Sequence, residues 1–178
     1  MKRKKEITKE KALARLTSLC GRSEQCEYEL NLKMLRWGLS ASDRREVIEY
    51  LKENRYVDDS RYARSYASDK ARFSAWGPNK IRFELAGRRI KGPVITEVLQ
   101  KVDQQIWKEG LLRNAVAKSR SLDLMDEEEG YANCRKLFQY LIGRGFPSSA
   151  CSRVVKVMKK KQEEEREERK EEKGEESS

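Results

Sequence analysis

The feature that most constrains the fold is an apolar pattern that occurs three times along the chain. Around each of three anchors, Leu39, Ile90 and Phe146, apolar residues stand nine and five residues before the anchor and eight, nine and twelve residues after it. The two earlier positions share one face of a helix, and the three later positions share one face of the next helix. Each anchor then lies in the turn between two helices. The pattern therefore predicts a helical unit that is repeated in tandem.

A further helical stretch precedes each copy, at residues 8–20, 59–74 and 104–120. Alternating apolar and polar residues, which would indicate strands, are scarce. We therefore expect an all-α chain of three tandem three-helix repeats that stack into an elongated, curved array. The expected boundaries are 1–57 for the first repeat with its basic N-terminus, 58–103 for the second, 104–158 for the third and 159–178 for a charged tail, either helical or disordered.

The three turns differ in the residue before the anchor. Gly38 and Gly145 precede the first and third anchors, at a position where a helix often ends in a left-handed conformation. Arg89 stands there in the second copy, and we expect it to adopt the same conformation at a cost of about 1 kcal/mol relative to glycine. The third repeat is longer because of SLDLMDEEEG, an acidic connector that we expect to be mobile.

The composition excludes several classes of protein. The 178 residues include no His, so neither a His-based acid–base pair nor a His metal ligand can form. Apolar runs are too short for a membrane-spanning helix, and the N-terminus lacks the apolar region of a signal peptide. The four Cys show no zinc-binding spacing and are expected to be reduced thiols. We expect a cytoplasmic non-enzyme with no catalytic residues, metal site or cofactor.

The net charge indicates an acidic partner. The chain carries a formal charge of +10, and residues 1–158 alone carry +12, since the tail holds seven basic and nine acidic residues. A positive field of this size favours nucleic acid or an acidic protein surface. The second repeat has the densest basic set, which we predict to be a binding surface rather than an ordinary solvated face: Arg61, Arg64, Lys70, Arg72, Lys80, Arg82, Arg88, Arg89 and Lys91.

The most distinctive local motif is the acidic pair at the start of the second repeat. Two adjacent carboxylates can serve in metal binding or acid catalysis, but no further ligand completes such a site. A structural role explains the motif better. Asp58 is placed to cap the following helix, and Asp59 to lie against the positive helix end. Val57 and Tyr62 have the spacing of a hydrophobic staple across this helix start.

Three segments together resemble the RecX family, the bacterial regulators of the RecA recombinase. They are YVDDSRYARSYASDKARF, WGPNKIRFEL and LIGRGFPSSACSRVV, and the resemblance covers about residues 8–158. The chain departs from the family pattern at Arg89, where glycine is usual, and in its longer charged tail.

The resemblance implies a cytoplasmic, monomeric modulator that lies in the groove of the RecA–single-stranded DNA filament. It implies inhibition of the ATPase and of strand exchange, and through them modulation of recombination, DNA repair and the SOS response. On this interpretation the nine basic side chains dock to the filament and its DNA, and Asp58 and Asp59 stabilise the start of the helix that follows them. The alternative is a general nucleic-acid-binding helical repeat protein without recombinase specificity.

Overall fold

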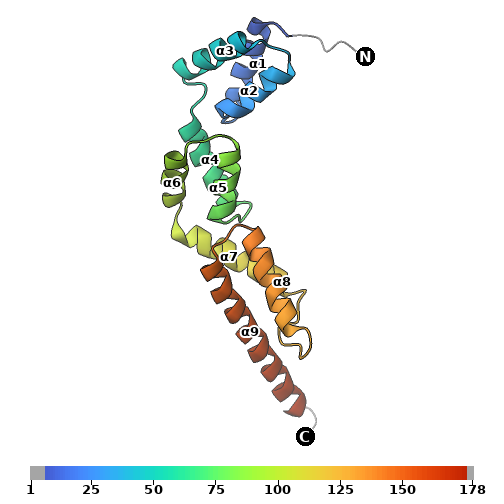
Figure 1. Cartoon of the computed structure of the whole chain (residues 1–178). Helices are drawn as coiled ribbons and strands as arrows, with labels where there is room; N and C mark the ends of the chain where they lie inside the picture. The colour runs from blue at the N-terminus through green and yellow to red at the C-terminus, as the bar shows by residue number, and fades with distance from the viewer. Residues whose placement is uncertain (1–6, 176–178) are drawn as a thin grey trace, which may run out of the picture. The chain divides into compact units, whose positions relative to one another are not determined.

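Apolar residues at helical spacing build every element that the structure describes. The computed structural model describes residues 7–175; the lysine-rich start of the predicted first repeat, residues 1–6, and residues 176–178 lie outside this range. Within it the chain forms nine helices and no strand (Figure 1): α1 Lys9–Cys20, α2 Glu27–Arg36, α3 Ala41–Glu53, α4 Asp59–Arg72, α5 Pro78–Gly87, α6 Gly92–Gln100, α7 Gln104–Ser119, α8 Gly130–Gly143 and α9 Ser148–Glu175. The predicted all-α fold is confirmed.

The helices divide into two compact units. Unit 1 comprises the described residues of Met1–Ser68 and Phe83–Lys101, and unit 2 comprises those of Asp69–Arg82 and Val102–Ser178. The division runs through α4 and α5, so each of these helices contributes to both units. Of the predicted repeat boundaries, two fall between helices and the third falls inside α9. The division into three repeats stays a prediction.

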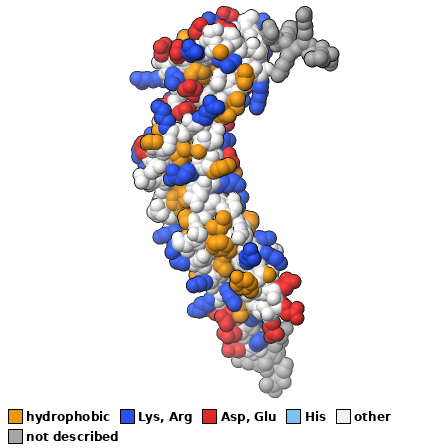
Figure 2. All heavy atoms as spheres, viewed as in Figure 1, with side chains coloured by type: hydrophobic (Ala, Val, Ile, Leu, Met, Phe, Trp, Pro, Cys, Tyr) orange, Lys and Arg blue, Asp and Glu red, His pale blue; other side chains and the backbone are white. Residues whose placement is uncertain are grey.

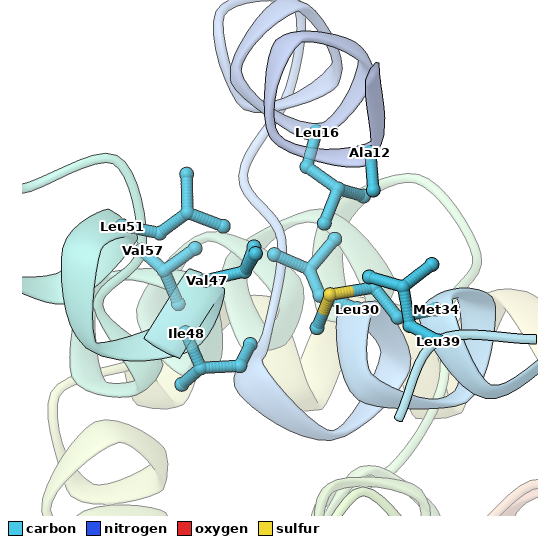
Figure 3. Close-up of a cluster of buried hydrophobic side chains, with 9 residues drawn as sticks. All are labelled: Ala12, Leu16, Leu30, Met34, Leu39, Val47, Ile48, Leu51 and Val57. Atoms are coloured by element: carbon cyan, nitrogen blue, oxygen red, sulfur yellow. The ribbon is translucent and has the colours of Figure 1, made fainter. Parts of the chain in front are cut away.

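The repeated apolar positions form the interior. The positions of the first copy contribute to one cluster of unit 1 with residues of α1, and the labelled side chains of α1, α2 and α3 point toward one another in Figure 3. A second cluster in unit 2 contains the anchor Phe146 with residues of α7, α8 and α9. Every predicted apolar position in the three copies is buried except Val154 and Val155, which are half-buried. The pattern therefore identified the core.

All three turn residues have the predicted backbone conformation. The φ angle is +87° at Gly38, +92° at Gly145 and +59° at Arg89. Arg89 adopts the left-handed conformation despite its side chain, and its guanidinium lies 4.9 Å from the ring centre of Tyr28 in the same unit. A cation–π contact of this kind offsets part of the backbone strain, since it contributes about 0.5–1 kcal/mol at an exposed site.

The acidic connector between α7 and α8 is packed, which differs from its predicted mobility. Leu124 of the connector is fully buried in unit 2. Gln162, from the predicted tail, accepts from the Leu124 N–H at 2.9 Å and donates to the carbonyls of Ser119 at 3.2 Å and Leu122 at 2.9 Å. Arg166 adds an ion pair with Asp123. The first part of the tail thus continues α9 and holds the connector.

Replacement of Gln162 by alanine is expected to destabilise the protein by about 2 kcal/mol, because three hydrogen bonds are lost and their half-buried backbone partners are left without them. Urea unfolding followed by circular dichroism measures the loss. Glu163→Ala is the matched control, since Glu163 is the exposed neighbour on the same helix. Equal stability of the two variants would contradict the role assigned to Gln162.

Candidate partner-binding surface

The nine predicted basic residues are divided between the two units. Lys and Arg side chains are spread over the visible face of the molecule rather than gathered at one spot (Figure 2). Unit 1 holds Arg61, Arg64, Arg88, Arg89 and Lys91, whereas unit 2 holds Lys70, Arg72, Lys80 and Arg82. The structure therefore gives two basic groups, and the role of each member follows from its own contacts.

Arg88 is largely occupied inside unit 1. Its guanidinium forms ion pairs with Glu29 and Glu84, each at 2.9 Å, and lies 4.9 Å from the ring centre of Tyr66. Only 23% of its side chain is exposed. Burial opposes its charge most strongly, but the hydrogen bond to Glu84 and the nearby Tyr62, Tyr66 and Glu29 together outweigh burial, and the pKa of the guanidinium is raised. We conclude that Arg88 joins α2 to α5 and contributes little charge to a partner.

Arg61 has a similar structural role at the start of α4. Its Nε donates to Glu24 at 2.6 Å, and its Nη2 donates to the carbonyl of Arg55 at 3.2 Å. The hydrogen bond to Glu24 raises the pKa of the guanidinium. Of the five predicted basic residues in unit 1, this leaves Arg64, Arg89 and Lys91, which are all exposed.

In unit 2 the basic group is arranged around an indole ring. The ammonium groups of Lys70 and Lys80 lie 5.1 Å and 4.4 Å from the ring centre of half-buried Trp76. Both distances are within the range of cation–π attraction. Trp76 therefore orients two cations, while Arg72 and Arg82 are exposed on the flanking helices.

The acidic pair caps two helices. Asp58 Oδ1 accepts from the N–H groups of Ser60 at 2.8 Å and Arg61 at 3.0 Å, which caps α4. Asp59 Oδ1 instead accepts from the N–H of Glu27 at 2.9 Å, at the start of α2. There the N-terminal capping residue is Cys26, which makes no side-chain capping bond. The sequence predicts Asp59 against its own helix end and does not predict this second cap. Nothing in the sequence around Asp59 indicates a partner 32 residues away.

The pKa values of the two carboxyl groups are shifted in opposite directions, although both capping bonds favour the charged form. The backbone N–H of Arg61 lowers the pKa of exposed Asp58, since the bond favours the charged form. Burial raises the pKa of Asp59, and the bond from Glu27 opposes that rise only in part. Val57 and Tyr62, the predicted staple, are both buried beside this helix start.

Asp58→Ala is expected to lower the free energy of unfolding by about 1 kcal/mol at neutral pH, the usual effect of losing an N-terminal cap. Because the pKa of Asp58 is depressed in the folded state, its stabilisation is present at neutral pH and is lost as the pH falls below about 4. Urea unfolding of both proteins across this pH range tests the prediction. Asp58→Asn keeps an acceptor and should retain most of the stability without the pH dependence.

Comparison with known proteins places this helix start in a defined family. Residues 58–99 match the family model described as RecX, second three-helix domain, and this span contains all nine basic residues and both caps. The regulatory protein RecX of Clostridium botulinum strain Eklund 17B is 32% identical over 133 residues, which is 75% of this chain and 59% of that protein. The chain belongs to the RecX family.

Other RecX proteins extend the match over most of the chain. The regulatory protein RecX of Clostridium perfringens strain 13 is 26% identical over 85% of this chain and 72% of its own length. The fold agrees with two crystal structures. A regulatory protein RecX gives a TM-score of 0.71 at 21% identity over 82% of this chain and 70% of its own. RecX from Lactobacillus salivarius gives 0.70 at 17% identity over 84% and 96%.

The RecX family is a family of regulatory proteins and not an enzyme family. Within the described residues, His, Cys, Asp and Glu form no group of three that could hold a metal ion. The same part of the chain has no helix long and apolar enough to cross a membrane. The four Cys are free thiols, and Cys26 and Cys151 are fully buried.

Two exposed phenylalanines are not among the predicted site residues. Phe73 at the end of α4 is 80% exposed, and Phe83 on α5 is 77% exposed. Neither residue occupies a position of the repeated apolar pattern. An apolar residue outside that pattern is the signal by which the sequence could have identified them. Phe73 also lines a groove of unit 2, and a large apolar side chain that lines a groove and that no core position requires is a candidate for contact with a partner.

Proposed function

We propose that this chain binds the filament formed by the RecA recombinase on single-stranded DNA and inhibits its ATPase and strand exchange. Membership of a family of proteins named regulatory protein RecX carries the proposal. The exposed cations of both units, which include Arg64 and Lys91 in unit 1 and Arg72 in unit 2, support it because they suit a partner lined with acidic side chains and phosphates. On this proposal the protein acts as a monomer in the cytoplasm and modulates DNA repair and the SOS response.

The structural roles of Arg61 and Arg88 refine which residues dock. These two side chains form ion pairs with Glu24, Glu29 and Glu84 inside unit 1, so their substitution would disturb the fold as well as the surface. We assign docking to the other seven members of the predicted set. They are Arg64, Lys70, Arg72, Lys80, Arg82, Arg89 and Lys91.

The direct test is the ATPase activity of RecA on single-stranded DNA at increasing concentrations of this protein. We expect inhibition at stoichiometric or lower ratios of protein to RecA. Unchanged ATPase activity at these ratios would contradict the proposal.

Binding separates this function from general nucleic-acid binding. A filament modulator binds preformed RecA filaments more tightly than naked single-stranded DNA at the same salt concentration. A general nucleic-acid-binding protein would bind naked DNA equally well, and its affinity would fall steeply as salt rises. Fluorescence anisotropy with the two substrates compares the alternatives directly.

A further inference from the structure

Unit 2 has an exposed apolar groove between the end of α4 and α7. Phe73 is 80% exposed on one side of it, and Leu112 is 44% exposed on the other. The groove has a volume of about 620 Å³, and Ala71, Ile106 and Gly110 complete its apolar lining. Apolar surface left open to water in this way is typical of a site that another molecule covers.

The charged residues around this groove favour a negatively charged partner. Arg72 and Arg113 line it, and both are exposed. Arg113 Nη2 donates to the carbonyl of Arg72 at 3.0 Å, which fixes the Arg113 guanidinium beside the end of α4. This bond uses one of the five donors of an arginine. Glu109 is the one carboxylate of the lining, and it accepts from Gln105 at 3.0 Å.

We propose that the groove lined by Phe73 and Leu112 binds a protein segment that inserts one aliphatic side chain and places a carboxylate next to it. The aliphatic side chain fills the apolar groove, and the carboxylate pairs with Arg72 and Arg113, whose planar guanidinium groups suit it. The inference rests on the proposed function, because it assigns this contact to the protein of the filament.

The lining favours a protein segment over a nucleic acid. Bases bind to exposed surfaces mainly by stacking on aromatic rings, and successive bases need successive rings. Phe73 is the only aromatic residue of the groove, and the rest of its apolar lining comes from aliphatic side chains and a glycine. Such a lining matches the shape and chemistry of leucine, isoleucine or valine better than the flat face of a base.

The first experiment measures filament binding of the full chain with Phe73→Ala and with Phe83→Ala as the matched control. The two phenylalanines are almost equally exposed, so neither substitution should unfold the protein. We expect Phe73→Ala to weaken binding about tenfold or more, the effect of removing a residue central to an interface, and Phe83→Ala to change it less. Equal affinity of Phe73→Ala and the unsubstituted protein would overturn the inference.

The second experiment does not involve the recombinase and therefore separates failure of this inference from failure of the proposed function. The full chain labelled with ¹⁵N is titrated with an acidic octapeptide that carries one central leucine, with the same peptide carrying serine instead, and with an oligothymidylate. We expect the leucine peptide alone to shift the amide signals of residues 71–73 and 106–113. Absence of these shifts, equal shifts with the serine peptide, or larger shifts with the oligothymidylate would each overturn the inference. The expected shifts in a protein that fails to bind filaments would retain the groove and reject only the proposed function.

Discussion

Gly145→Ala is expected to lower the free energy of unfolding by about 3 kcal/mol or more, the largest effect we expect from a single substitution in this chain. The φ angle of Gly145 is +92°, a conformation that alanine rarely adopts. A Cβ atom at this position would also lie 2.5 Å from the backbone N of Lys80 and closer still to its Cβ. Both effects act at the turn that carries the buried anchor Phe146.

The close approach at Gly145 has an identifiable cause. The turn between α8 and α9 is hydrogen-bonded to the start of α5. The N–H of Gly77 donates to the carbonyl of Arg144 at 2.8 Å, and the N–H of Asn79 donates to the carbonyl of Gly145 at 3.0 Å. Arg144 also donates to the carbonyls of Ser74 and Ala75. A side chain at position 145 would separate the two backbones and break these bonds together.

Thermal unfolding followed by circular dichroism measures this loss, which corresponds to a fall in Tm of about 6–12 °C for a chain of this size. The matched control is Gly143→Ala, two residues earlier. A Cβ atom there meets nothing within 4 Å, and alanine is the better helix former, so we expect stability to be unchanged or slightly raised. Equal losses for the two variants would show that the contact with Lys80 is not the cause.

Much of the fold could be predicted because its helices follow local rules. The apolar spacing identified the core, and Arg89 was recognised as a left-handed residue from its position before Ile90. The packing of the connector could not be predicted in the same way. It depends on Gln162, a polar residue that hydrogen-bonds backbone groups about 40 residues away, and helical periodicity carries no information about such a contact.

The candidate surface was harder to predict than the fold, because a basic residue looks the same in sequence whether it faces water or an acidic side chain. Arg61 and Arg88 were grouped with the docking residues for this reason. Their partners, Glu24 and Glu29, lie 37 and 59 residues away along the chain. The exposed state of Phe73 likewise depends on where the turn after α4 leads the chain, which the local sequence does not specify.

Charge reversal of Arg64, Arg82 and Lys91 together is expected to raise the concentration needed for half-maximal inhibition of the RecA ATPase about tenfold or more. The reason is that three attractive contacts with the acidic surface of the RecA filament become repulsive. The three side chains are exposed, and Arg88 is left intact because its reversal would break the pairs with Glu29 and Glu84. Lys91 precedes α6, where glutamate is compatible with the positive helix end.

The control for this variant must change the net charge equally without touching the predicted surface. Charge reversal of Lys11, Arg45 and Lys108 meets this requirement, since all three are exposed and lie on α1, α3 and α7. If the basic set of the second repeat docks the protein, the control retains near-normal inhibition. Equal loss in both variants would mean that only the overall field matters, because a long-range field depends on net charge and not on position. Unchanged inhibition by a folded Arg64, Arg82 and Lys91 variant would exclude these residues from docking, and binding would then depend on other surfaces such as the groove lined by Phe73 and Leu112.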